Sequence, residues 1–403
     1  MKLTALTAAV SAISLFLYFF QNPEKKFNDF EVLDYNNTTF FNEYKDADYN
    51  DFFSEIQYLV FESIPYSPLD VIDQLRIIND TFYVTDINSR GRIFLFTEYG
   101  EFINKVGFEP QINASGETFF EKCNDSGHLI IGYPDEQSLM KFSNDGDFVS
   151  RDSVGFYFGN FVYNSNLNRY LFHTYMPYPG FSDSLNHQVV LTDSNFTVID
   201  KHFPRPYNIS KEFNVTYAVQ RSNESADYVY YADFFNGEIY ELDFSGNKKL
   251  IYKIEDGIED RQDSVLMLNA EFPSYEVVMH NKRFYPFTGY YVNEDFLILF
   301  NYFEQRVRTH VVFNRETLNG NRFASNIPIN LESWNRFNFH FETPVSAVEN
   351  QFIQFRSVRS WSQMLDFLPD SIDISHLPHP TAEGPVLKFY NFDKEVIGKT
   401  TGD

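Results

Sequence analysis

Short apolar runs separated by tight polar turns recur along the whole chain, and this pattern predicts strands rather than helices. Six stretches have the form of an apolar strand, a four-residue turn and a second strand. They are LFTEYGEFINKVG (95–107), LMKFSNDGDFVSRDSV (139–154), VVLTDSNFTVIDKHF (189–203), IYELDFSGNKKLIYKI (239–254), HVVFNRETLNGNRFA (310–324) and VLKFYNFDKEVIGK (386–399). Aligned on Phe96, Phe142, Leu191, Leu242, Phe313 and Phe389, the residues four positions on are Gly100, Gly146, Asn195, Gly246, Thr317 and Asp393. Gly and Asn tolerate the positive φ of hairpin turns, so the repeat predicts hairpins.

A second series of hairpins interleaves with the first. Its turns are expected near Asn79–Asp80, Asn124–Gly127, Asn164–Asn168, Ser222–Asp227, Asn293–Asp295 and Glu349–Gln351. Each repeat unit then holds four strands, and six such units predict an all-β fold, a six-bladed β-propeller of four-stranded antiparallel blades. No amphipathic helical stretch of α/β type separates the strands. We expect 56–61 to add a strand to the last blade and close the ring, because closure removes exposed sheet edges.

The repeat resembles a known group of proteins. The segments QYLVFES (57–63), DVIDQLRIINDTFYVTD (70–86), RIFLFTEYGEFINKVG (92–107) and EGPVLKFYNFDKE (383–395) are similar to the six-bladed β-propeller proteins of Bacteroidetes, which include TolB-like propellers and lipoproteins. The hairpins also resemble NHL repeats. The resemblance covers roughly residues 54–398 and implies an exported protein of the cell envelope, without implying an activity. The chain departs from the lipoprotein pattern, because no cysteine lies soon after the N-terminal apolar run, between Leu3 and Asp51.

The charge of the chain excludes one class of partner. Its 56 acidic and 32 basic residues give a formal net charge of −24, and it contains no long basic run. Nucleic-acid binding requires a concentrated Lys/Arg surface, so we expect no nucleic-acid partner. The single cysteine, Cys123, excludes an internal disulfide framework and a cysteine-based zinc cluster.

The N-terminus carries the one membrane signal that the sequence shows. Lys2 precedes an apolar stretch, residues 3–20, that is short for a spanning helix and slightly long for a signal-peptide core. We favour an uncleaved anchor or atypical export signal, while a cleaved signal and a buried helix are the alternatives. The expected organisation is a signal or anchor segment (1–22), a linker (23–53) and the propeller (54–399), with membrane association through the N-terminal segment only.

The longest connections are expected on one face of the propeller. In an up-and-down blade, the turns between strands 1–2 and 3–4 share one face, and the 2–3 and blade-to-blade connections share the other. We call these the short-turn face and the long-loop face. The long connections are predicted at 108–118, 175–188, 204–215, 255–285, 326–343 and 357–385. Binding sites concentrate on loops held by a rigid scaffold, so we expect the site on the long-loop face or in the adjoining channel mouth.

Both tryptophans fall in these loops, with arginines and a histidine nearby. Indole offers a flat apolar surface for a sugar ring, and the Arg fork holds a carboxylate. The predicted ligand-binding residues are Trp334, Arg336, His340, Arg356, Arg359 and Trp361. The alternative is that the aromatic residues alternate along a strand and both tryptophans pack between blades.

No motif indicates catalysis. The chain has no GxSxG elbow, P-loop, HExxH or dinucleotide fingerprint. His376 and His379 are predicted to lie in an exposed proline-rich loop, so no metal ligands, catalytic residues or cofactors are assigned. The leading hypothesis is an exported, envelope-associated propeller that binds a glycan, peptide or envelope protein on its long-loop face. The alternatives are a metal-dependent hydrolase, lyase or lactonase with its site at the channel mouth, and a structural envelope scaffold.

Overall fold

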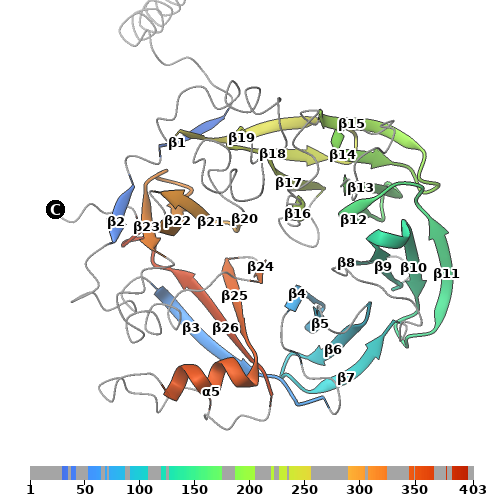
Figure 1. The fold of residues 1–403 in the computed structure, drawn as a ribbon, viewed down its shortest axis with the longest axis horizontal. Coiled ribbons are helices and arrows are strands. Elements are labelled where there is room, and N and C mark those ends of the chain that lie inside the picture. Colours follow the sequence, from blue (N-terminus) through green and yellow to red (C-terminus); the bar gives the residue numbers. More distant parts are fainter. Residues whose placement is uncertain are drawn as a thin grey trace, which may run out of the picture.

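A computed structural model shows six β-sheets arranged as blades around a central axis (Figure 1). The innermost strands lie near the centre of the ring, and the outermost strands run along its perimeter. The structure describes residues 30–34, 38–41, 53–64, 69, 72–86, 91–107, 119–123, 127–174, 187–204, 219–221, 227–233, 236–255, 289–304, 307–324, 345–348, 350–366, 378 and 384–397.

Each blade is a meander of antiparallel strands, as predicted. Blade 1 comprises β4 (Ile72–Ile78), β5 (Thr81–Asp86), β6 (Ile93–Thr97) and β7 (Phe102–Val106), and blade 2 comprises β8 (Phe119–Lys122), β9 (Leu129–Tyr133), β10 (Ser138–Phe142) and β11 (Phe148–Ser153). Blade 3 comprises β12 (Phe158–Asn164), β13 (Arg169–Thr174), β14 (His187–Thr192) and β15 (Val198–Pro204), and blade 4 comprises β16 (Val219–Arg221), β17 (Tyr228–Asp233), β18 (Glu238–Asp243) and β19 (Lys248–Glu255). Blade 5 comprises β20 (Gly289–Val292), β21 (Phe296–Glu304), β22 (Val307–Asn314) and β23 (Gly320–Ala324), and blade 6 comprises β24 (Ser346–Val348), β25 (Gln351–Arg356), β26 (Val386–Phe392) and β3 (Phe53–Val60). The short 3-10 helix η3 (Pro134–Glu136) joins β9 to β10, and α5 (Val358–Asp366) lies between β25 and β26.

The hydrophobic core lies between neighbouring blades. Alternate residues of β6 divide between two interfaces: Phe94 and Phe96 join the cluster shared with blade 6, whereas Ile93 and Leu95 join the cluster shared with blade 2. This division follows from the two-residue period of a strand whose sheet is covered on both faces. Each fully buried Phe stabilises the fold by about 2 kcal/mol, so the aromatic-rich composition suits this architecture.

The N-terminal strand β3 closes the ring, which confirms the prediction for 56–61. It pairs along its whole length with β26, from Val60 opposite Val386 to Phe53 opposite Phe392. The outermost strand of the last blade therefore comes from the other end of the domain. Ring closure joins residues more than 300 positions apart and leaves no open gap between blades 6 and 1.

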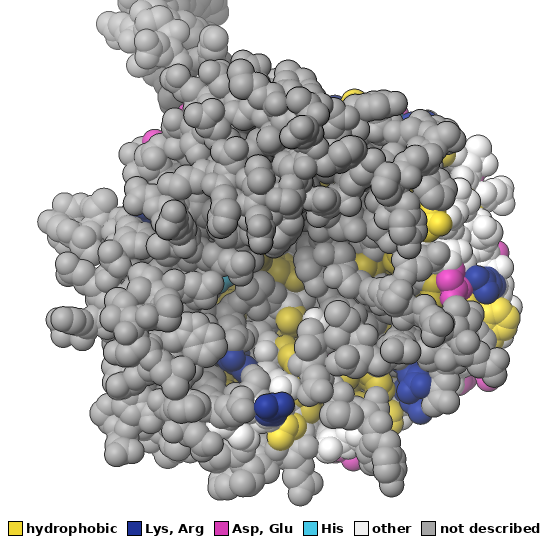
Figure 2. All heavy atoms as spheres, viewed as in Figure 1, with side chains coloured by type: hydrophobic (Ala, Val, Ile, Leu, Met, Phe, Trp, Pro, Cys, Tyr) yellow, Lys and Arg dark blue, Asp and Glu magenta, His cyan; other side chains and the backbone are white. Residues whose placement is uncertain are grey.

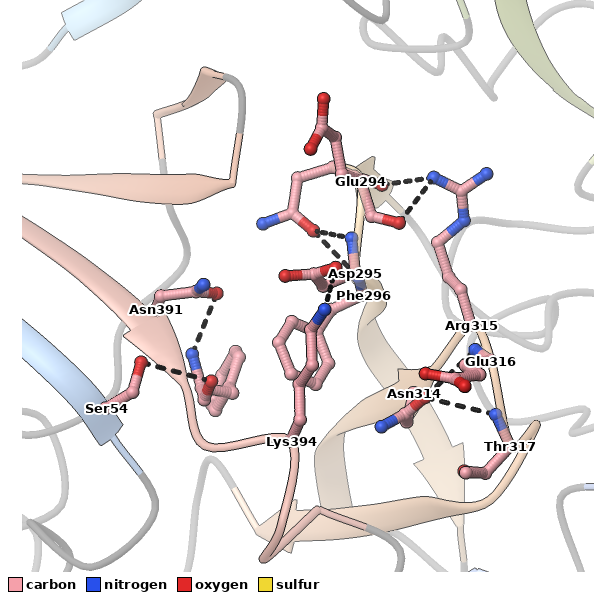
Figure 3. Close-up of polar contacts among 12 residues, drawn as sticks. Ser54, Glu294, Asp295, Phe296, Asn314, Arg315, Glu316, Thr317, Asn391 and Lys394 are labelled. Carbon is pink, nitrogen blue, oxygen red and sulfur yellow. Dashed lines mark hydrogen bonds and ion pairs between the residues drawn. The ribbon is translucent and has the colours of Figure 1, made fainter.

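The sixth predicted hairpin, 386–399, is wrong in its second half. Its first strand is β26, but residues 393–397 form a turn in which Asp393 accepts hydrogen bonds from the amides of Val396 and Ile397. Ile397 then packs into the core between blades 5 and 6. Because β3 already occupies the fourth-strand position, the chain turns inward instead. Lys394 of this turn reaches Asp295 at the β20–β21 turn, 2.5 Å away, and ties the two blades together (Figure 3).

The N-terminal segment 23–53 contributes two strands that the sequence did not reveal. β1 (Glu31–Asp34) pairs in parallel with β19, and β2 (Thr39–Phe41) pairs in parallel with β23. Leu33 of β1 is buried in the core cluster of blade 4. Blades 4 and 5 thus have five strands each, and one stretch of chain supplies the outermost strand of three consecutive blades.

The glycines of the predicted repeat are explained by the packing of their turns. Gly100, Gly146 and Gly246 have φ of 81, 92 and 97°, a region that L side chains rarely adopt. Each turn also packs against the outer strand of the preceding blade. A Cβ at Gly100 would lie 2.4 Å from the carbonyl oxygen of Val60, and one at Gly246 would lie 2.9 Å from a carboxylate oxygen of Asp200.

In blades 3 and 5 the positive φ falls one residue later than the alignment placed it. Phe196 (φ 60°) and Leu318 (φ 61°) adopt the left-handed conformation, rather than Asn195 and Thr317. Bulky residues there carry backbone strain of about 1–2 kcal/mol. Phe196 offsets this strain by packing its ring against Tyr170, with centroids 5.2 Å apart.

Candidate functional site

Buried ionisable side chains gather toward the long-loop face. Among the described residues, the buried Arg76–Glu121 pair lies in the other half of its strands. The remaining buried Asp, His, Lys and Arg residues lie in the half of their strands nearer the long-loop face, and they are Asp86, His173, His202, Asp233, His310, Arg356 and Lys388. Burying such groups is costly unless they are paired or used, so this end of the core is chemically distinct.

The short-turn ends use a different chemistry. There, buried asparagines close the turns: the Asn293 side-chain oxygen accepts hydrogen bonds from the amides of Asp295 and Phe296, at 3.0 and 2.7 Å. Asn314 does the same for the β22–β23 turn, as Figure 3 shows. The oxygens of these side chains already accept hydrogen bonds within their own turns. The long-loop face is therefore the candidate site.

The clearest constellation on that face is the Arg356 cluster, which we define as Tyr58, Gln354, Arg356, Trp361 and Lys388. In the register of blade 6, Gln354 lies opposite Lys388 and Lys388 lies opposite Tyr58, so the three form one row across β25, β26 and β3. Arg356 stands one row nearer the long-loop face, opposite Val386. Residues two apart on a strand share a sheet face, so the cluster lies on one side of the blade.

The charges of this cluster are held beside aromatic rings. The Nζ of Lys388, whose residue is 3% exposed, lies 4.8 Å from the ring centre of Phe53 and 5.4 Å from that of Tyr390. A cation over an aromatic face is stabilised by the ring quadrupole. Burial raises the pKa of the Tyr58 hydroxyl to about 12, and the positive charge of Arg356 opposes that rise. Tyr58 therefore remains a neutral hydrogen-bonding group at physiological pH.

Helix α5 covers the outer part of this row. Trp361 is 2% exposed and packs with Leu365 and Val386, its ring centre lying 5.8 Å from that of Tyr58. Its indole Nε1 donates a hydrogen bond to the carbonyl oxygen of Pro378 at 3.3 Å. The indole face that was predicted to stack on a ligand is thus covered. The alternative from the sequence also had this tryptophan buried, but between two blades, whereas here it packs between a helix and one blade.

The other predicted ligand-binding residues divide by location. Trp334, Arg336 and His340 lie outside the described residues. Arg359 is exposed on α5, and Arg356 is buried at the end of β25. The structure therefore brings Arg356 and Trp361 into one cluster on blade 6. Arg359 lies three residues after Arg356, on the exposed side of α5.

Sequence reasoning missed Tyr58, Gln354 and Lys388. For Gln354 and Lys388 the signal was present in the alternation of QFIQFR (351–356) and VLKFYNF (386–392), where these two residues share a strand face with Phe352 and Tyr390. A polar residue at a position reserved for the core marks a buried polar site.

A second missed constellation joins the innermost strands of blades 1 and 2. Arg76 on β4 and Glu121 on β8 form an ion pair with Nη1 to Oε2 at 2.8 Å, and their side chains are 10% and 3% exposed. The same Nη1 donates to the carbonyl oxygen of Phe120 at 3.1 Å. Gln74 accepts from the amide of Phe120 at 2.9 Å, so three side chains link the two strands at the channel wall.

In the parts of the chain that the structure describes, no three His, Cys, Asp or Glu side chains are grouped so as to hold a metal ion. Likewise, none of the described helices has the length and apolar character to cross a membrane. The apolar N-terminal segment 3–20 and the histidines at 376 and 379 are outside the described residues.

His310 provides a pH-dependent contribution to stability. It is buried beside Phe300, with ring centroids 5.5 Å apart, and burial lowers its pKa to about 3. Between this value and the unfolded pKa near 6.5, the unfolded chain binds a proton that the folded chain does not, so stability falls as pH falls. Leucine carries no titrating group, so His310→Leu should lose less stability on acidification. Between pH 7 and pH 5 we expect its free energy of unfolding to fall by about 2 kcal/mol less than that of the wild type. Urea unfolding at both pH values measures this, and an equal loss in both proteins would contradict it.

Comparison with known proteins supports the fold. A family model described as a six-bladed β-propeller, DUF5128, matches residues 26–354. A candidate exported protein from Bacteroides fragilis has a solved structure that superposes with a TM-score of 0.69 at 12% identity, covering 90% of this chain and 100% of that one. A DUF4221 family member from Bacteroides vulgatus gives a TM-score of 0.46 at 9% identity, covering 85% and 99% of the two chains.

At 12% identity, the likeness to the Bacteroides fragilis structure bears on the fold alone. A catalytically inactive virginiamycin B lyase from Staphylococcus aureus, bound to quinupristin, gives a TM-score of 0.39 at 11% identity, with 79% and 80% of the two chains covered. No curated protein matches the sequence. The family match spans most of the chain and agrees with the observed blades. The chain therefore belongs to the DUF5128 family of six-bladed β-propellers.

Proposed function

We propose that this propeller is an exported protein of the bacterial cell envelope that binds a ligand or partner on its long-loop face. A glycan, a peptide or an envelope protein bearing an acidic group fits best. The observation that carries the proposal is the concentration of buried Asp, His, Lys and Arg side chains toward that face, which includes Arg356 and Lys388 of the Arg356 cluster. Rigid strands hold these groups, and a preorganised site loses little entropy when it binds.

The charges of the cluster suggest the class of ligand. Arg356, Lys388 and the exposed Arg359 are cationic in a chain whose net charge is −24. Arg can hold a carboxylate through two parallel hydrogen bonds, which gives orientation as well as affinity. The net negative charge of the chain repels anions in general. A local group of cations therefore attracts an acidic ligand at that position of the surface. The apolar segment 3–20 is the proposed export signal or anchor.

An array of neutral and acidic glycans and peptides, probed with the purified full chain, tests this function. We expect acidic probes to be retained, and we expect Arg359→Ala to weaken the binding of the best probe by about tenfold, as for loss of a charge-assisted hydrogen bond. The matched control is Lys249→Ala, which removes an exposed cation from the outer strand of blade 4. Retention of no probe, or equal weakening by both variants, would contradict the proposal. Stoichiometric metal in the purified protein would support the hydrolase alternative instead.

A further inference from the structure

The outermost strands of the blades fall into two groups. β19 is covered by β1 and β23 by β2, whereas β3 is itself supplied by the N-terminal segment. β7, β11 and β15 of blades 1 to 3 are the last strands of their sheets among the described elements. The covered and uncovered edges lie on opposite sides of the ring (Figure 1).

The two groups differ at equivalent positions of the repeat. Counted from the positive-φ residue of the preceding turn, the strands of blades 1, 2 and 3 begin with the pairs Phe102–Ile103, Phe148–Val149 and Val198–Ile199. The covered β19 begins instead with Lys248–Lys249, and β23 begins with Gly320–Asn321. Proteins usually protect open sheet edges with charge, above all with lysine. At these first two strand positions the chain does the reverse: the lysines are on the covered β19, and the apolar pairs are on β7, β11 and β15. Basic residues follow further along these three strands, at Lys105, Arg151 and Lys201.

The apolar pairs reach the surface. Ile103, Phe148, Val149 and Ile199 are 50, 48, 48 and 44% exposed. They account for most of the large exposed hydrophobic residues among the described part of the chain. In Figure 2, hydrophobic side chains emerge beside Lys/Arg and Asp/Glu at the rim where Figure 1 places β11. An apolar stripe rimmed by charge is typical of an interaction surface.

The chain itself shows how such an edge is covered. β1 adds to β19 in parallel register, from Glu31 opposite Tyr252 to Asp34 opposite Glu255, and buries Leu33 in the core. An added strand satisfies the outward backbone groups of the edge, and an alternate side chain supplies apolar contact. The uncovered edges continue this belt around the ring and have the same blade geometry.

The charges beside the open edges define the partner further. The turns that lead into β7 and β11 carry the exposed acids Glu98, Glu101, Asp145 and Asp147. An incoming strand with Lys or Arg at its ends is therefore attracted to these turns, and an acidic strand is repelled.

We propose that the rim of blades 1 to 3, formed by β7, β11 and β15, binds an extended segment of a partner protein as an added strand. The segment alternates apolar residues with polar ones and carries Lys or Arg at its ends. It lies alongside the outer strand of a blade as β1 lies alongside β19. This surface is separate from the long-loop face, so its function is independent of the ligand site proposed above.

Peptide selection tests the rim directly. A phage-displayed library of random peptides is selected on the full chain, and the best sequence is synthesised and titrated. We expect alternating apolar and basic sequences, and we expect the amides of β7, β11 or β15 to exchange more slowly with solvent when the peptide is bound. The variant Ile103→Lys/Val149→Lys/Ile199→Lys should weaken binding at least tenfold.

A control of equal charge separates strand addition from electrostatics. Asn166→Lys/Ser245→Lys/Asn319→Lys adds the same three charges at exposed positions of the β12–β13, β18–β19 and β22–β23 turns, away from the turns that lead into β7, β11 and β15, and should leave binding within about twofold. Equal weakening by the two variants, or protection of amides elsewhere, would overturn the proposal. Light scattering of the free protein tests whether a second copy of the chain occupies the rim instead. A wild-type dimer that the edge variant converts to a monomer would assign the rim to that second copy.

Discussion

Gly384→Ala is expected to open the ring between blades 6 and 1. A Cβ at this position would lie 1.6 Å from the carbonyl oxygen of Phe61 and 2.7 Å from its carbonyl carbon, so the backbone itself must move. Phe61 donates its amide hydrogen to the carbonyl of Pro385 at 2.9 Å and stacks on Phe96 with centroids 4.1 Å apart. Displacement of Phe61 disturbs both contacts, and we expect a loss of roughly 3 kcal/mol or more in the free energy of unfolding.

Hydrogen exchange locates this effect, and chemical unfolding measures its size. Amides of β3 and β26 should exchange faster in Gly384→Ala than in the wild type, while those of blade 3 change little. Gly289→Ala is the matched control, because its Cβ would meet the side chain of Phe300 rather than backbone, with Cδ2 at 3.3 Å and Cβ at 3.9 Å, so a shift of a few tenths of an ångström relieves the contact. If the two variants were equally stable, the tight approach of Gly384 to Phe61 would not be what holds the closure.

Arg76→Met is expected to destabilise the fold by about 3–5 kcal/mol. It leaves Glu121, whose side chain is 3% exposed, as a buried charge without the guanidinium 2.8 Å away. The desolvation cost of that carboxylate is then uncompensated. This cost is larger than the net stabilisation that the intact ion pair contributes. The link between the inner strands of blades 1 and 2 is also reduced, since Arg76 no longer donates to Phe120.

The double variant Arg76→Met/Glu121→Leu identifies the cause. It removes both charges and replaces them with apolar groups of similar size, so we expect it to recover most of the lost stability. Urea unfolding of the wild type, both single variants and the double variant completes the cycle. A double variant as unstable as Arg76→Met alone would show that packing, not the buried charge, is responsible.

Local pattern was sufficient for most of the fold because each hairpin carries its own signal. The apolar strands, and glycines such as Gly100 and Gly246, predicted the blades, the short turns and the face that bears the long connections. The same reasoning failed at Phe196 and Leu318, where tertiary packing holds a bulky residue in a left-handed conformation. No local rule anticipates such an exception.

Long-range pairing accounts for what the sequence did not reveal. β1 and β2 have no pattern of their own, and they become strands only because the edges of β19 and β23 are available to pair with them. The residues after β26 turn inward because β3 already occupies the fourth-strand position.

The candidate site divides in the same way. The sequence placed Arg356, Arg359 and Trp361 in or beside a long connection, on the expected face. Only the structure joined Arg356 to Tyr58, Gln354 and Lys388, because that row depends on the register between β25, β26 and β3. By itself, then, the sequence determined the repeat, the blade and the two faces, since these follow from local alternation and turn chemistry. The tertiary structure decided which side chains meet and which edges are paired with an added strand, because those depend on pairing between segments far apart in the chain.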